Sequence, residues 1–112
     1  MPRLKKIHIN QVFFTVVFFI TGLIFGQNET LFQRGNDLYN QGKYEDAIDI
    51  YEKVIETSKH SSELYFNLGN AHYKLNNIAS SIYNYEKALL LDPNDKEAKN
   101  NLAFAQNMTI DA

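Results

Sequence analysis

The chain has 112 residues, no cysteine and a formal net charge of −2. This length allows one domain with a modest core, and the lack of cysteine excludes disulfides, thiolate nucleophiles and cysteine metal sites. Residues 27–112 contain 8 basic and 13 acidic residues, a net charge of −5. An acidic body without a basic stripe argues against a nucleic-acid partner, because neutralisation of phosphates dominates that affinity.

Residues 1–26 have the order of a secretory signal. Basic residues within 3–6 precede an apolar run over 12–25, and Gly26 stands before a polar stretch. The apolar run has 14 residues, fewer than the ~20 that a membrane-spanning helix needs. We therefore predict a signal peptide over residues 1–26 with cleavage near Gly26, and an uncleaved membrane anchor as the alternative. In both cases the remaining chain is expected outside the cytoplasm, in the periplasm or at the outer face of the inner membrane.

The rest of the chain follows a period of 34 residues. Several residues recur at this offset, in the pairs Gly35 and Gly69, Asn36 and Asn70, Tyr39 and Tyr73, and Tyr51 and Tyr85. A fixed period of this length indicates a stacked array of helix–turn–helix units. We predict two units, over about residues 28–61 and 62–95.

Apolar residues at three- and four-residue steps predict five helices. Their expected ranges are 29–40, 44–57, 63–75, 78–91 and 96–108. Gly42 can end the first helix in the left-handed conformation. Ser61 or Ser62 can cap the third helix, and Pro93 ends the fourth because the residue before proline is driven out of the α region.

Gly35 and Gly69 stand inside predicted helices, where glycine costs ~1 kcal/mol relative to alanine. A steric reason is expected, because each glycine lies where the first helix of its unit approaches the second. Small residues on the second helix, Ala47 and Ser81, match this interpretation. The large neighbours of these residues would then interlock around a close backbone contact.

With these residues in view, residues 28–95 resemble two tandem tetratricopeptide repeats. The residues of the repeat signature are Gly35, Ala47, Tyr51, Gly69, Ser81, Tyr85 and Pro93. The resemblance implies an all-α solenoid of two helix–turn–helix repeats, placed after the N-terminal hydrophobic signal helix. Residues 96–108 are expected to form a capping helix or the start of a third repeat, followed by a tail over 109–112.

A narrower resemblance concerns the order of segments. A signal, two repeats and the sequence NNLAFAQN are together similar to the start of BatE-type proteins of bacterial aerotolerance operons. Relatives of that kind continue into transmembrane helices and an SH3-like domain. The resemblance implies a role in a membrane-associated envelope complex, with membrane contact through the N-terminal segment or a missing C-terminal region.

No catalytic or metal-binding pattern is present in the sequence. His8, His60 and His72 are scattered, with no pair three or four residues apart, whereas a metal site needs several converging ligands. We interpret each histidine as a surface or partly buried residue. We expect no enzyme activity, no metal and no cofactor.

The family resemblance implies a concave groove lined by the first helix of each pair. Aromatic and asparagine side chains gather on these helices, and such side chains hold peptide segments in grooves. The predicted groove residues are Phe32, Asn36, Tyr39, Phe66, Asn67, Asn70, Tyr73, Asn101 and Phe104, with Lys74 beside them. The alternative for Phe32, Phe66 and Tyr73 is packing between adjacent repeats.

One binding mode of the family grips a terminal carboxylate with two asparagines and three basic residues. Asn36 and Asn67 match the asparagine pair, but the basic positions hold Phe32, Glu97 and Asn101. Carboxylate capture is therefore not expected.

We predict a non-catalytic scaffold of the bacterial envelope that binds a protein or peptide partner in its concave groove. Two alternatives stay open. The chain is an accessory segment of an enzyme whose catalytic domain lies beyond Ala112, or it self-associates through an apolar end formed by Leu102, Phe104 and Met108.

Overall fold

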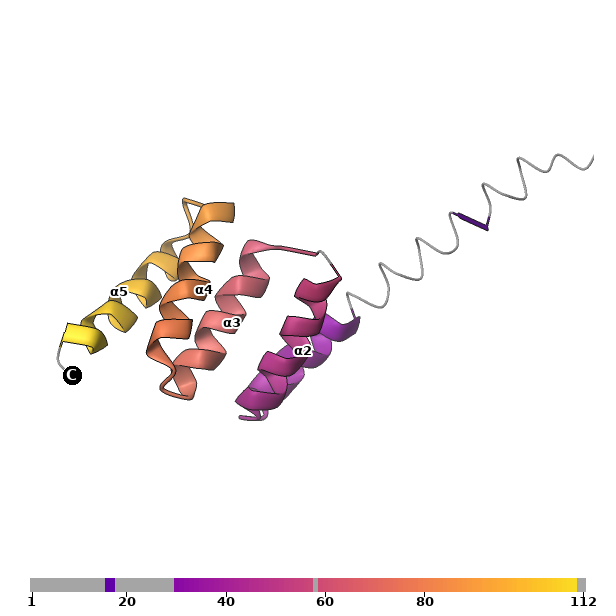
Figure 1. Cartoon of the computed structure of the whole chain (residues 1–112), viewed down its shortest axis with the longest axis horizontal. Coiled ribbons are helices and arrows are strands. Elements are labelled where there is room, and N and C mark those ends of the chain that lie inside the picture. Colours follow the sequence, from indigo (N-terminus) through magenta and orange to yellow (C-terminus); the bar gives the residue numbers. More distant parts are fainter. Residues whose placement is uncertain (1–15, 18–29, 58, 111–112) are drawn as a thin grey trace, which may run out of the picture.

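The structure is a computed structural model, and it describes residues 16–17, 30–57 and 59–110. In this part of the chain a helix over 30–40 is followed by α2 (Tyr44–Glu56), α3 (Ser62–Lys74), α4 (Ile78–Leu91) and α5 (Lys96–Ile110), without strands (Figure 1). The predicted all-α class is confirmed for these residues, and the helix ends lie within two residues of the predicted ones. The predicted signal peptide falls outside the described residues, apart from Val16 and Val17.

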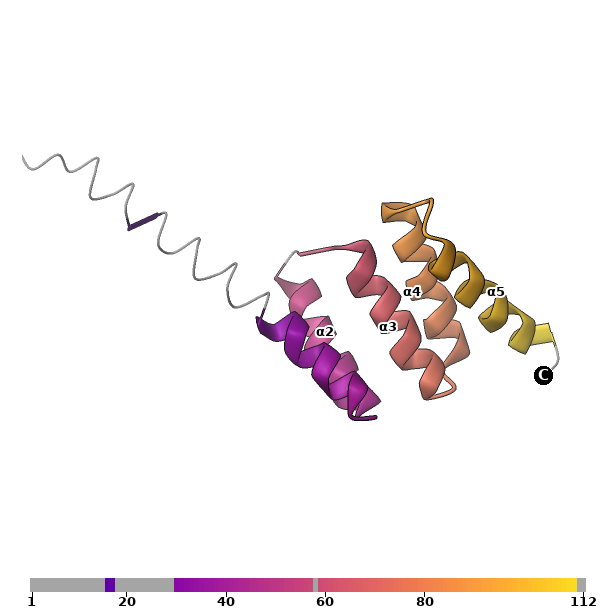
Figure 2. The same ribbon diagram turned by 180° about the vertical axis from the view of Figure 1, so that it is seen from behind.

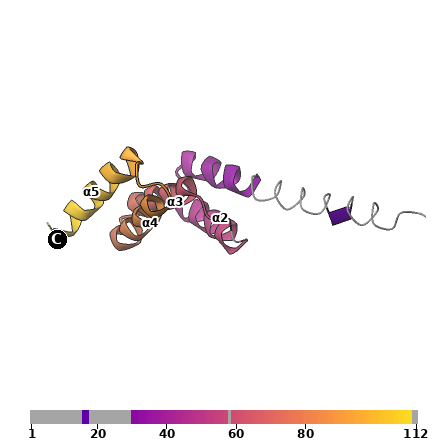
Figure 3. The same ribbon diagram turned by 90° about the horizontal axis from the view of Figure 1, so that it is seen from above.

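The described helices form consecutive antiparallel hairpins, as the view from behind in Figure 2 makes clear. Among them, α3 packs against α2, α4 and α5, and α4 packs against α5. Seen from above (Figure 3), the helix over 30–40 and α5 lie on one side, α2 and α4 lie on the other, and α3 lies between them. Helix α3 is therefore the centre of the solenoid and contributes to both of its faces.

The turns inside the two hairpins use the same backbone conformation. Gly42 has φ of 76° and Asn76, 34 positions later, has φ of 61°. The predicted left-handed turn at Gly42 is confirmed, and Asn76 is among the few residue types that adopt this conformation readily. The third helix begins as predicted, because the Ser61 hydroxyl accepts a hydrogen bond of 3.1 Å from the backbone N–H of Leu64.

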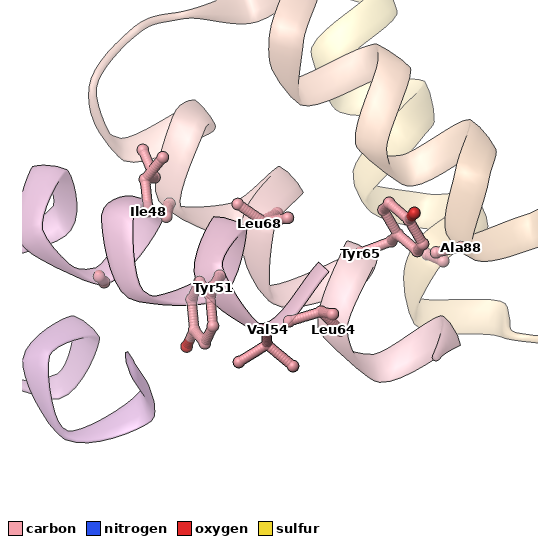
Figure 4. Packing of buried hydrophobic residues seen from close by; sticks show 10 residues of the cluster. Ile48, Tyr51, Val54, Leu64, Tyr65, Leu68 and Ala88 are labelled. Carbon is pink, nitrogen blue, oxygen red and sulfur yellow. The ribbon is translucent and has the colours of Figure 1, made fainter. Parts of the chain in front are cut away.

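Buried side chains of α2, α3, α4 and α5 form a continuous core. In Figure 4 Tyr51 and Val54 of α2 lie near Leu64 and Leu68 of α3, and Tyr65 of α3 lies beside Ala88 of α4. This packing explains why an α2 helix rich in acidic residues is stable, since burial of one apolar stripe outweighs weak local propensity.

Each mid-helix glycine accommodates a tyrosine ring. A Cβ atom at Gly35 would lie 2.5 Å from Cε1 of Tyr51, and one at Gly69 would lie 2.6 Å from Cδ1 and Cε1 of Tyr85. Ser81 is also close, since its hydroxyl donates a 2.9 Å hydrogen bond to the Gly69 carbonyl. The predicted steric role is thus refined: the contact that requires glycine is a ring lying on the helix backbone.

Candidate functional site

A pocket of about 250 Å³ opens on the concave side of the solenoid, where the helix over 30–40, α3 and α5 face one another. Its lining consists of Tyr39, Asn70, Tyr73, Lys74, Tyr85, Asn101 and Phe104. The structure therefore brings five of the predicted groove residues together, along with Lys74. The addition is Tyr85, which belongs to the predicted repeat signature. The spacing in the sequence could have indicated that Tyr85 lines the pocket, because a tyrosine of α4 that lies 15 positions after Asn70 reaches its amide.

Hydrogen bonds join Asn36 of the first unit to a tyrosine of the same unit and to Asn67 of the second. The Asn36 Oδ1 atom accepts one bond of 2.7 Å from the Tyr51 hydroxyl and another of 2.9 Å from Nδ2 of Asn67. These contacts connect the helix over 30–40 to both α2 and α3. The Asn36 acceptor is occupied within the protein, and the Nδ2 donors of its amide are not used by these two bonds.

The second unit repeats this arrangement 34 residues later. The Asn70 Oδ1 atom accepts 2.5 Å and 3.0 Å bonds from the Tyr85 hydroxyl and from Nδ2 of Asn101. We call the two three-residue sets the amide links. At the next equivalent position stands Phe104, whose side chain is 64% exposed. The links therefore hold adjacent helical units in register. At the position where a third link would start, the exposed ring of Phe104 replaces the asparagine.

Phe32 and Phe66 are placed differently from the pocket residues. Their rings are partly buried and lie 6.1 Å from the Tyr51 ring and 6.0 Å from the Tyr85 ring, respectively. Aromatic pairs at such separations contribute packing energy. Each of these rings packs on the tyrosine of its own repeat, whereas the alternative expected packing between adjacent repeats. Phe32 also lines a separate pocket of about 280 Å³.

Burial controls the ionisation of the tyrosines beneath the groove. Loss of hydration raises the pKa of Tyr51 and that of Tyr85 to about 12. Burial also raises the pKa of Tyr39, with the nearby Tyr44 adding to the effect. The phenols stay neutral at physiological pH, and in the pocket lining Lys74 supplies the charged side chain. Within the described residues no cluster of His, Asp and Glu could hold a metal ion.

A second groove of about 520 Å³ lies on the opposite, convex side. Helices α2 and α4 do not pack against each other, and the groove lies between them above α3. Its lining consists of Glu52, Ile55, Tyr65, Leu68, His72, Ala79, Ser80, Tyr83 and Asn84. The Nδ1 atom of His72 is buried without a hydrogen-bond partner, and burial lowers the pKa of His72 while Glu52 opposes the shift.

Family models match most of the helical region. One described as "TPR repeat" matches residues 35–76, and one described as "Tetratricopeptide repeat" matches residues 62–95. Residues 35–95 are tetratricopeptide repeats. The predicted repeat family and the helix–turn–helix interpretation of the 34-residue period are confirmed. Tetratricopeptide repeats typically mediate protein–protein interactions and are non-catalytic. No helix in the described part of this repeat protein has the length and hydropathy needed to cross a membrane.

Several curated proteins share this repeat region. Hsp70-Hsp90 organizing protein of Triticum aestivum is 39% identical over 64 residues, which are 57% of this chain and 11% of that protein. Human tetratricopeptide repeat protein 16 is 29% identical over 68 residues, 61% of this chain and 8% of that protein. Mouse protein O-mannosyl-transferase TMTC1 is 30% identical over 76 residues, 68% of this chain and 8% of that protein. The chain thus spans about a tenth of the length of these relatives.

Among solved structures, the first TPR of Spaghetti (RPAP3), bound to an HSP90 peptide, aligns with a TM-score of 0.44 and 23% identity. The alignment covers 74% of this chain and 93% of that chain.

Proposed function

We propose that this chain is a non-catalytic interaction module that binds a peptide segment of a partner protein in its concave pocket. The observation that carries the proposal is the gathering of Tyr39, Tyr73 and Phe104 around the amides of Asn70 and Asn101. Aromatic side chains supply contact area at low entropic cost, and amides hydrogen-bond to a peptide backbone. The volume of about 250 Å³ fits a side chain or two of an extended segment.

The amide links support this assignment because they pre-organise the groove. The Oδ1 atom of Asn36 and the Oδ1 atom of Asn70 each accept two hydrogen bonds. The orientation of both amide planes is therefore fixed before a partner binds. Fixed donors lose little entropy on binding, which favours affinity.

The cellular setting is part of the proposal. The basic and apolar order of residues 1–26 supports export, which would place the module in the periplasm or at the outer face of the inner membrane. The BatE-type resemblance supports an aerotolerance-type membrane complex as its context. The enzyme-accessory and self-association alternatives stay predictions.

Photocrosslinking in cells tests the concave assignment. A photoreactive amino acid at Tyr73 or at Phe104 should capture a discrete partner, because both side chains line the pocket. The matched control carries the same group at Asn100, which is exposed on α5 but does not line the pocket. A Phe104→Ala change should reduce capture from Tyr73 several-fold, as expected when an exposed aromatic anchor is lost.

Equal capture from Asn100 and from the pocket positions would overturn the concave assignment. Capture from Tyr73 that survives Phe104→Ala unchanged would remove α5 from the binding surface.

A further inference from the structure

The outer stripe of α4 differs in chemistry from the equivalent stripe of α2. Along α4, Ala79, Tyr83 and Leu90 lie at steps of four and seven residues and therefore share one helix face. All three are exposed, with Tyr83 at 57% and Leu90 at 76% of their full accessibility. The positions 34 residues earlier, on α2, are Glu45, Asp49 and Glu56.

The replacement of acidic residues on α2 by apolar residues on α4 concerns the outer face of the two helices. The same two helices keep Tyr51 and Tyr85 at their buried positions, together with the pairs Glu52-Lys53 and Glu86-Lys87. Packing does not require an apolar stripe at these positions, because α2 packs with acidic residues there. Exposed apolar stripes bordered by polar residues mark interaction surfaces.

The stripe borders the convex groove. Ala79 and Tyr83 form part of its α4 wall, Glu52 and Ile55 form its α2 wall, and buried Tyr65 and Leu68 of α3 belong to its floor. Lys87 lies 5.6 Å above the Tyr83 ring, so the ring is held toward solvent by a cation–π contact and not by core packing. Among the residues that line the groove, those of α4 are uncharged and Glu52 of α2 is acidic, while Lys87 adds a positive charge beside Tyr83.

The charge of α2, of whose acidic residues Glu52 lines the groove, indicates the complementary occupant. Helix α2 has five acidic residues and one basic residue, all exposed: Glu45, Asp46, Asp49, Glu52, Glu56 and Lys53. Helix α4 has one acidic and one basic residue. A segment lying between these helices meets negative charge on one side and apolar side chains on the other, and complementary charge steers and orients such binding.

We propose that this convex groove is a second docking site, which binds an amphipathic helix of a partner protein with apolar and basic faces. Its apolar face lies on Tyr83 and Leu90, and its basic face lies toward Glu52 and the acidic exposed side of α2. This is the helix-in-groove mode of recognition. The site is independent of the concave pocket, which shares no lining residue with it.

Binding of a synthetic peptide to the purified full chain tests the proposal. The probe is a labelled 18-residue helix with leucine on one face and lysine on the other, followed by fluorescence anisotropy. The key variant is Tyr83→Asp with Leu90→Glu, which places at both positions the residues that α2 carries there. We expect this double change to weaken binding at least tenfold. A peptide with glutamate in place of lysine should bind the original protein at least tenfold more weakly.

Two single variants distinguish the convex groove from the concave pocket as the place where the peptide binds. Glu52→Gln should weaken binding of the lysine peptide several-fold without altering the fold, since Glu52 is exposed. Phe104→Ala, in the concave pocket, should leave that binding unchanged. The proposal would be overturned if the original chain and the double variant bound the lysine peptide with equal affinity. It would also be overturned if only Phe104→Ala abolished that binding. The concave assignment is tested separately by the photocrosslinking experiment.

The other occupants are outcomes of the same comparison. If sedimentation shows that the original chain forms dimers and the double variant is monomeric, the stripe binds a second copy. If vesicles of phosphatidylglycerol and phosphatidylcholine bind the original chain but not the double variant, the stripe contacts lipid. Either result contradicts a partner helix as the occupant.

Discussion

The two repeats of this protein share one inward-facing arrangement and differ in the chemistry of an outward-facing stripe. Inside, each has a glycine under a tyrosine ring and an asparagine that accepts from that tyrosine. Outside, the acidic stripe of α2 becomes an apolar stripe on α4. The difference shows that stacking dictates only a small set of positions. The remaining surface is available for recognition, and the outer stripe is one place where the second repeat departs from the first.

The largest effect is expected where the two repeats agree most closely. Gly69→Leu inserts a side chain at a point where even a Cβ atom would lie 2.6 Å from the Tyr85 ring. Overpacking of this kind costs about 1–3 kcal/mol, and each kcal/mol lowers the Tm of a small domain by roughly 4–8 °C. Thermal unfolding followed by circular dichroism measures the loss.

Ala103→Leu provides the matched control for this change. Ala103 occupies the same position of the repeat in α5 but is exposed, so the stability should change by less than about 0.5 kcal/mol. An unchanged Tm for Gly69→Leu would mean that the ring does not lie on the glycine as described.

Next in size is the response to alkaline pH, which should be shared by both repeats. Burial raises the pKa of Tyr51 and of Tyr85 from 10.0 to about 12, so the unfolded chain loses these protons at lower pH than the folded chain. The stability that these two phenols contribute is fully present below pH 10 and is lost as the pH rises toward 12. Denaturant unfolding of the original chain and of the Tyr51→Phe, Tyr85→Phe double variant should show a steeper decline for the original. Parallel declines would contradict the burial of these phenols.

A smaller effect is expected from single loss of either hydroxyl at neutral pH. Tyr85→Phe removes the 2.5 Å hydrogen bond to Asn70, and Tyr51→Phe removes the 2.7 Å bond to Asn36. Each change should cost about 0.5–1.5 kcal/mol in urea unfolding, by similar amounts if the repeats are equivalent. A clear inequality would show that one amide link carries more of the stability than the other.

The smallest effect concerns His72, a position at which the repeats differ. Burial lowers its pKa below 6.5, with Glu52 opposing the shift, so below about pH 6.5 the unfolded chain binds a proton that the folded chain takes up only at lower pH. Stability therefore decreases as the pH falls below 6.5. His72→Leu introduces the residue found at position 38 in the first repeat. Melting at pH 5.0 and 7.5 should show a smaller difference for this variant, and an equal difference would assign the acid sensitivity elsewhere.

Much of the fold could be predicted from sequence because it depends on local and periodic signals. Gly42 takes the left-handed turn, Ser61 caps α3, and the 34-residue period places the helices within two residues of their ends. Each of these features depends on the chemistry of one residue or on regular spacing. They are visible without knowledge of distant contacts.

The candidate site is harder to predict from the sequence than the fold, because its geometry depends on contacts between helices. Asn36 and Asn67 were expected in the groove, but their amides bind each other, and no period reveals which amide atom faces which neighbour. Phe32 and Phe66 pack on the tyrosine ring of their own repeat, an arrangement that differs from both groove lining and packing between adjacent repeats. The convex groove was missed entirely, since it arises from the separation of α2 and α4 across α3.

The small size of the buried residues of α5 has a consequence for how the molecule opens. Ala98 and Ala105 of α5 are fully buried, whereas α2 and α3 contribute Tyr51, Val54 and Leu64 to the core cluster. Alanine buries little apolar area, at about 25 cal/mol per Å², and a solenoid helix is stabilised chiefly by its neighbours. The amides of α5 should therefore exchange with deuterium before those of α3, so that the described array opens from its C-terminal helix inward.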